Sequence, residues 1–121
     1  MPDLKISEML EMQKNLLAKH PNWRPHCPDT GIRQLLWMGG ELGEVIDVIK
    51  KKSEEEYMSP GPLREHLLEE FTDVMMYLND ALLCYGITPE EISQAYLKKH
   101  EWNMVRDYVR ENKELFSSNA K

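Results

Sequence analysis

Five of the seven prolines of this 121-residue chain are gathered in two short clusters, at residues 21–28 and 60–62, and long stretches without proline follow both clusters. Residues 29–59 and 63–88 contain no proline, and apolar side chains recur in both at intervals of three and four. That spacing is typical of an α-helix with one apolar face, and no stretch alternates long enough to predict a strand. The pattern therefore favours an all-α fold.

Four helices are expected between the proline clusters. They are predicted over roughly residues 6–19, 30–52, 63–85 and 88–110. Asp29 or Thr30 is expected to cap the second helix, and Gly86 is a suitable residue to end the third. The segment Thr88-Pro89-Glu90-Glu91 predicts a capping box at the start of the fourth helix.

Long helices joined by connections of modest length predict an antiparallel bundle of the four-helix type. A chain of this size forms one domain, so we expect a single helical domain over residues 1–121. The polar residues 53–62 are predicted to be a mobile loop, and residues 111–121 a frayed tail. The core of the domain is expected within residues 30–110.

Composition excludes several kinds of partner. Fifteen basic and 21 acidic side chains give a formal net charge of −6, which argues against binding nucleic acid or an anionic membrane. No apolar run is long enough to span a membrane, and the N-terminal residues lack an apolar signal core. Cys27 and Cys84 lack metal-type spacing and are interpreted as free thiols, so a cytoplasmic protein is expected.

Two pairs of acids share one spacing on the two long helices. Glu41 and Glu44 lie three residues apart, as do Glu70 and Asp73, and helical geometry puts each pair beside the apolar stripe of its helix. The stripes predicted to be buried consist of Leu35, Met38, Leu42, Ile46 and Ile49 and of Leu67, Phe71, Val74, Leu78 and Leu82. The two acid pairs are therefore predicted to face each other across a groove of the bundle.

Four carboxylates in a partly buried groove repel one another, each close pair by up to about 4 kcal/mol at an effective dielectric constant of about 20. Either some of them are protonated or a cation lies among them. An all-oxygen set favours Mg²⁺ or Mn²⁺, and no histidine has a glutamate three residues before it, as a di-iron site on a helical bundle requires. The alternative is that both pairs are ordinary solvated acids.

Polar and aromatic side chains complete the candidate site. Lys99, Asn103 and Arg106 lie on one face of the predicted fourth helix, which suits phosphate oxygens but also suits a solvated face. Trp37 lies on the flank of Glu41 and Glu44, and Tyr77 on that of Glu70 and Asp73. Both aromatic rings are candidates for stacking on a nucleobase, and edge-of-core packing is the alternative.

These motifs, taken in order over about residues 30–110, resemble the MazG-like family. They are Glu41-Leu-Gly-Glu44, Glu70-Phe-Thr-Asp73-Val-Met-Met-Tyr77, Gly86-Ile-Thr-Pro-Glu-Glu-Ile and Lys99-x-x-x-Asn103-x-x-Arg106. The family consists of all-α nucleoside triphosphate pyrophosphohydrolases and includes dimeric dUTPases and dCTP pyrophosphatases. The resemblance implies a hydrolase that forms a homodimer or homotetramer.

The resemblance also implies a role for each candidate residue. Glu41, Glu44, Glu70 and Asp73 would bind Mg²⁺, for which Mn²⁺ is a substitute. Lys99, Asn103 and Arg106 would bind the phosphates, and Tyr77 would lie near the nucleotide. Glu41 or Glu44 would be the catalytic residue that takes a proton from the attacking water, and the sequence does not decide between them.

The reaction expected is hydrolysis of a nucleoside triphosphate to the monophosphate and pyrophosphate, a step that would suit the housecleaning of nucleotide pools. A phosphoribosyl-ATP-type pyrophosphohydrolase is an alternative within the same superfamily. A helical interaction module without enzymatic activity is a second alternative, although a protein that only binds a partner has no need of the four acids.

Overall fold

The computed structural model describes residues 2–119, without the side chains of residues 108 and 116–119, and these residues form helices and no strands. The all-α prediction is therefore confirmed for this part of the chain. In chain order the helices are α1 (Ile6–Ala18), α2 (Pro28–Lys51), α3 (Glu54–Met58), α4 (Pro62–Cys84), α5 (Pro89–Val105) and α6 (Tyr108–Asn119). Within the described residues, none of these helices combines the length and apolarity needed to cross a membrane.

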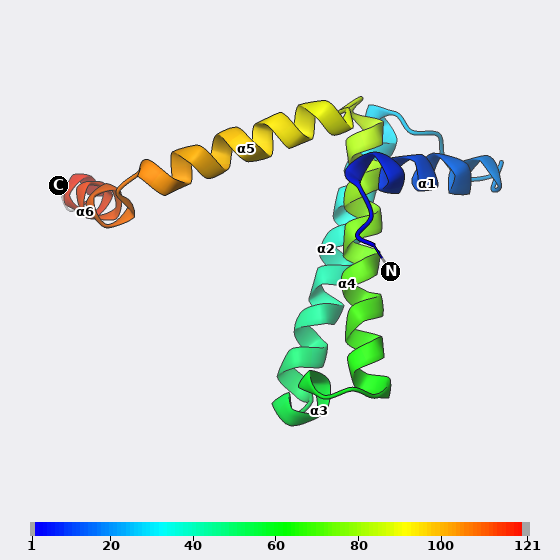
Figure 1. Cartoon of the computed structure of the whole chain (residues 1–121), viewed down its shortest axis with the longest axis horizontal. Coiled ribbons are helices and arrows are strands. Elements are labelled where there is room, and N and C mark those ends of the chain that lie inside the picture. The colour runs from blue at the N-terminus through cyan, green and yellow to red at the C-terminus, as the bar shows by residue number, and fades with distance from the viewer. Residues whose placement is uncertain (1, 120–121) are drawn as a thin grey trace. The chain divides into compact units, whose positions relative to one another are not determined.

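The chain divides into two compact units, Met1–Pro89 and Glu90–Lys121, which we describe separately. In the first unit α2 and α4 run antiparallel beside each other, and the short helix α3 lies at the turn between them (Figure 1). α1 and α3 both pack against α4. The antiparallel packing that the bundle prediction requires is present in this pair.

The α2 helix begins two residues earlier than predicted. Pro28 is its first residue and Cys27 precedes it with an extended backbone, so Asp29 and Thr30 lie inside the first turn. The amide of Gly31 donates to the carbonyl of Cys27 at 3.0 Å, which closes this turn. Proline is favoured at the first helical position because the N–H it lacks has no partner there in any case.

The C-terminus of α4 confirms the role predicted for Gly86. This glycine has a φ of 65°. The Gly86 amide donates to the carbonyl of Leu83 at 3.1 Å, and the Ile87 amide donates to that of Leu82 at 2.9 Å. The two bonds form a Schellman motif, which satisfies carbonyls that the end of a helix otherwise leaves without partners.

Two segments differ from the sequence prediction. The stretch predicted as a loop over residues 53–62 contains α3, whose first turn is capped by the Ser53 hydroxyl accepting from the Glu56 amide at 3.2 Å. The fourth predicted helix ends at Val105 rather than near Arg110, and a new helix follows over most of the predicted tail. The Asp107 carboxylate accepts from the Arg110 amide at 2.9 Å, which makes Asp107 the cap of α6.

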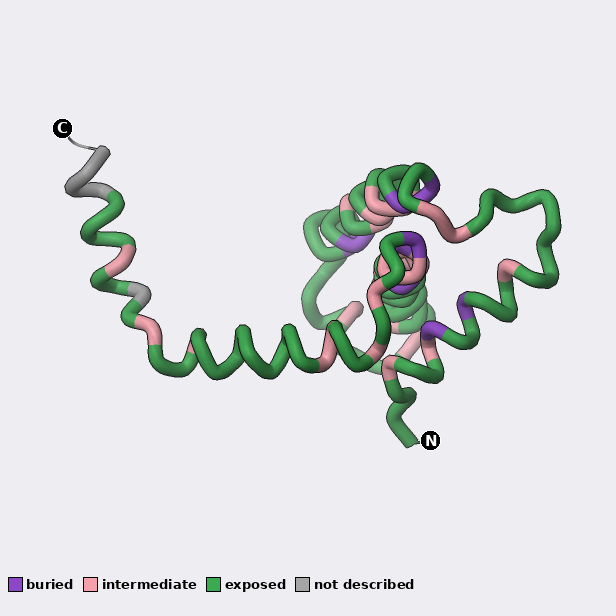
Figure 2. The backbone as a smooth tube through the Cα atoms, turned by 90° about the horizontal axis from the view of Figure 1, so that it is seen from above, coloured by how far each residue is buried: buried purple, intermediate pink, exposed green. Residues whose placement is uncertain are grey.

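The core of the first unit is small and lies between α2 and α4. Val45, Val48 and Leu67 are its buried members, and among the described residues the buried positions belong to α1, α2 and α4 (Figure 2). The apolar stripes predicted to be buried are only partly so: Leu67 lies in the core and Val74 packs against it, whereas half of the predicted positions are exposed. Leu42, Ile46, Ile49, Phe71 and Leu78 are each exposed over 41–48% of their surface.

This exposure corrects the predicted orientation of α2 and, for Phe71 and Leu78, part of that of α4. On α2, Glu41 lies on the same face as Val45 and Val48, the face that packs against α4. α2 therefore has two apolar faces, and the narrower one contacts α4 within the chain. The carboxylates lie on this helix–helix face rather than on the flank of a buried stripe.

Candidate metal and ligand site

Three carboxylates meet where α2 and α4 pack together. Glu41 and Glu44 come from α2 and Glu70 from α4, and one oxygen of each lies within 4.8 Å of the others. Glu70 is buried, with 8% of its surface exposed, and its Oε2 has no hydrogen-bond partner. Because the spacing of three residues keeps Glu41 and Glu44 on one face of α2, both reach the single glutamate opposite.

The electrostatics of this acidic triad, Glu41, Glu44 and Glu70, are unfavourable when all three are ionised. The pKa of Glu70 is raised to about 7, mainly by burial and in addition by the neighbouring Glu44 and Glu41. His66 Nε2 lies 3.7 Å from Glu70 Oε1, at the exposed edge of the group. The triad therefore favours a bound proton or cation, as the sequence argument anticipated.

Asp73, the fourth predicted ligand, is not a member of the triad in this structure. It lies one turn further along α4, is half-buried, and lines a pocket instead. Of the four acids that were predicted to face one another, three therefore do so, and Asp73 does not.

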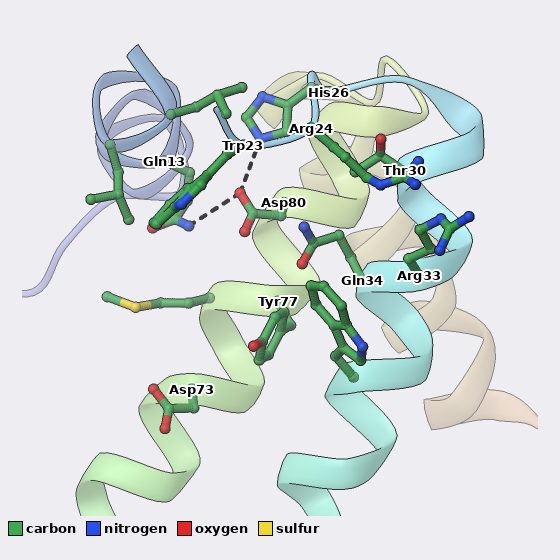
Figure 3. Close-up of a pocket in the computed structure, with 14 residues that line it drawn as sticks. Gln13, Trp23, Arg24, His26, Thr30, Arg33, Gln34, Asp73, Tyr77 and Asp80 are labelled. Carbon is green, nitrogen blue, oxygen red and sulfur yellow. Dashed lines mark hydrogen bonds and ion pairs between the residues drawn. The ribbon is translucent and has the colours of Figure 1, made fainter. Parts of the chain in front are cut away.

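This pocket has a volume of about 440 Å³ (Figure 3). It is bounded by α1, α2, α4 and the segment between α1 and α2. Its lining residues are Gln13, Leu16, Leu17, Trp23, Arg24, His26, Thr30, Arg33, Gln34, Trp37, Asp73, Met76, Tyr77 and Asp80. Its walls thus combine aromatic rings, carboxylates and amides, with two arginines among them.

Trp37 and Tyr77, the two aromatic residues singled out in the sequence, both line this pocket and contact each other. Their rings meet edge to face, with centroids 6.1 Å apart and planes at 70°. Burial raises the pKa of the Tyr77 hydroxyl, and Glu41, Asp73 and Asp80 add to the effect. Trp37 lies one turn from Glu41 on α2, and Asp73 lies one turn from Glu70 on α4, so the triad and the pocket are neighbours.

The wall formed by the segment between α1 and α2 was not predicted. Asp80 Oδ1 accepts from Gln13 Nε2 at 3.2 Å and lies 3.0 Å from His26 Nε2, so one carboxylate oxygen holds both α1 and this segment (Figure 3). The Trp23 ring stacks on His20 with centroids 3.9 Å apart. Trp23, in a proline-rich segment, was the only sequence signal for this wall.

Lys99, Asn103 and Arg106 belong to the second unit. Lys99 is exposed on α5, and Asn103 Oδ1 is buried without a hydrogen-bond partner. The Arg106 guanidinium donates twice to Glu111 Oε2, at 2.7 and 2.9 Å. Their predicted role in phosphate binding stays a prediction.

No family model, curated protein or solved structure matches this chain. The functional argument therefore depends on the triad and on the pocket beside it.

Proposed function

We propose that the chain is a Mg²⁺-dependent pyrophosphohydrolase that converts a ribo- or deoxyribonucleoside triphosphate to the monophosphate and pyrophosphate. The observation that carries the proposal is the position of the acidic triad directly beside an aromatic-lined pocket. The triad would hold the metal ion that binds the triphosphate of such a substrate, and the pocket would accommodate its base. The family resemblance of the ordered motifs adds to this argument.

The residues of the triad fit a hard divalent cation. All of the donors are carboxylate oxygens, the class that Mg²⁺ and Mn²⁺ prefer, and Glu70 Oε2 is buried without a partner. Glu41, Glu44 and Glu70 would hold the ion, with Asp73 as a further ligand. When bound, the ion would supply charge neutralisation at the phosphates and acidify a water molecule.

The other roles belong to side chains of the chain itself. Glu41 or Glu44 would accept a proton from the attacking water, and Trp37 and Tyr77 would position the base. Lys99, Asn103 and Arg106 would bind phosphate oxygens. Phosphoryl transfer depends mainly on such positioning and on charge stabilisation.

Release of pyrophosphate from a panel of ribo- and deoxyribonucleoside triphosphates, with Mg²⁺, Mn²⁺ or EDTA, tests the proposal. We expect metal-dependent release with the monophosphate as co-product. Glu70→Gln should reduce turnover at least about 100-fold, in the range typical for loss of a group that stabilises charge in the transition state. Glu69→Gln is the matched control, because Glu69 is the adjacent acid and is exposed.

Full metal-dependent turnover by Glu70→Gln would refute the assignment of ligands. If the folded protein hydrolyses none of the triphosphates, one of the two alternatives, a phosphoribosyl-ATP-type pyrophosphohydrolase or a binding module, would replace this proposal. Turnover of a phosphoribosyl-ATP-type substrate would favour that activity. The absence of both turnover and stabilisation by metal would favour a binding module.

A further inference from the structure

Gln34 occupies a special position in the pocket. Its side chain extends from α2 toward α4, into the space between Asp80 and Tyr77 (Figure 3). The carbonyl oxygen Oε1 is buried and has no hydrogen-bond partner. A buried polar atom without a partner is uncommon in folded proteins and costs free energy, which a ligand that donates a hydrogen bond would recover.

Two carboxylates line the pocket together with Gln34, and its cationic side chains are those of Arg24 and Arg33. Asp80 and Asp73 line the same pocket, and one oxygen of Asp80 is already engaged by Gln13 and His26. These two contacts fix the Asp80 carboxylate in place. Gln34 Oε1, which has no partner, and the fixed carboxylate of Asp80 therefore favour a ligand that presents N–H donors to these two groups.

The location of Gln34 along α2 suits the edge of a base. Gln34 precedes Trp37 by three residues and Glu41 by seven, so all three lie on one face of the helix. Seven residues correspond to roughly 10 Å along the helix axis. Gln34 and the acidic triad thus lie at opposite ends of a line, with the Trp37 and Tyr77 rings between them.

We propose that Gln34 is a specificity-determining residue that accepts a hydrogen bond from an exocyclic amino group of the base. The inference rests on the proposed function for the nature of the ligand. Cytosine and adenine carry such an amino group, whereas uracil and hypoxanthine carry a carbonyl oxygen at the equivalent position. The second pair would place an oxygen against Gln34 Oε1 and would bind more weakly.

Binding of nucleoside monophosphates in EDTA tests the inference without any hydrolysis. Quenching of tryptophan fluorescence in the full chain gives the Kd for the CMP–UMP pair and for the AMP–IMP pair. We expect the amino-bearing member of each pair to bind roughly 5- to 100-fold more tightly, which is the range for a buried hydrogen bond gained or left unsatisfied. Equal affinities in the wild-type chain, or a preference for the carbonyl member, would overturn the inference.

Variants of Gln34 assign the preference to this side chain. Gln34→Leu removes the acceptor and should bring the two members of each pair to within about 2-fold, whereas Gln34→Glu retains an acceptor oxygen and should keep the preference. Gln94→Leu, an exposed position on α5, is the matched control. An unchanged preference in Gln34→Leu would overturn the inference.

A failure of the inference about Gln34 can be distinguished from a failure of the proposed hydrolase function. Selective binding in EDTA by a chain that hydrolyses no triphosphate would support the role of Gln34 and refute the hydrolase. Hydrolysis of all triphosphates, with no difference in affinity within either pair, would support the hydrolase and refute the role of Gln34.

Discussion

At the scale of single residues, Glu70 is the most consequential side chain of the chain. It is a buried acid with an unpartnered oxygen and two further glutamates beside it. Its pKa is raised from an ordinary value of 4.5 to about 7, first by burial and then by Glu44 and Glu41. The folded state therefore keeps a proton that the unfolded chain loses at lower pH.

The free energy of unfolding in EDTA should fall as the pH rises from about 4.5 to 7 and then level off, because the unfolded chain binds fewer protons in that window. Glu70→Gln should remove most of this dependence and stabilise the chain at pH 8 by on the order of 2 kcal/mol. Urea unfolding at a series of pH values measures both effects. Saturating Mg²⁺ should flatten the wild-type profile, and a wild-type curve that rises through this window would contradict the argument.

The two cysteines should differ in reactivity. Both are free. The pKa of Cys27 is lowered, mainly by the Thr30 hydroxyl, which lies 3.4 Å from its sulfur, whereas burial raises the pKa of Cys84. Iodoacetamide at pH 7.5 should therefore modify Cys27 several-fold faster, because the thiolate is the nucleophile. Mass spectrometry of the digested protein gives the two rates, and equal rates would contradict the assignment.

At the scale of elements, the sequence predicted the helices well where a local signal ends them. Gly86 and the Thr88-Pro89 step mark two boundaries, and both agree with the structure to within one residue. The break after Val105 contains neither proline nor glycine, and it depends on Asp107 acting as a cap. A single aspartate in a polar stretch does not by itself predict the end of one helix and the start of the next.

The direction in which α2 and α4 face was harder to predict. An apolar stripe indicates that a face will be covered, and it does not say whether the same chain covers it. The carboxylates of Glu41, Glu44 and Glu70 were expected to meet, and they do. The pocket wall formed by the segment between α1 and α2 was missed because this segment has no periodicity and because Gln13 and Asp80 pair across 67 positions.

The glycine at the end of α4 permits a direct test of the Schellman motif. Gly86→Ala should lower the free energy of unfolding by about 1 kcal/mol, since a φ of 65° is costly for a residue with a Cβ. Gly40→Ala is the control, because Gly40 lies inside α2 with nothing within 4 Å of an added Cβ. It should raise stability by roughly 0.5–1 kcal/mol. Thermal or urea unfolding that ranks the two variants in the opposite order would refute the role of Gly86.

At the scale of the whole molecule, the exposed apolar surface is large for a chain of this size. Leu42, Ile46 and Ile49 on α2, with Phe71 and Leu78 on α4, leave open the stripes that the sequence predicted to be buried. Exposed apolar surface of this extent is characteristic of an interaction surface. We propose that the homodimer or homotetramer implied by the family resemblance covers these residues.

Self-association is therefore expected at micromolar concentrations. Ile46→Glu should shift the chain toward the monomer by burying a charge in the proposed interface, whereas Asp47→Asn, which changes an exposed residue paired with Lys51, should leave the assembly intact. Light scattering coupled to size-exclusion chromatography measures the mass of each. A monomeric wild-type chain would refute the proposal.

The acidic triad lies on the face where the first unit builds its core. Replacing the buried Glu70 and the half-buried Glu41 with apolar residues of similar volume should extend the core of Val45, Val48 and Leu67. The same change would erase the site. Selection for thermal stability and selection for chemistry therefore act in opposite directions at these two positions, and engineering for stability should begin elsewhere in the chain.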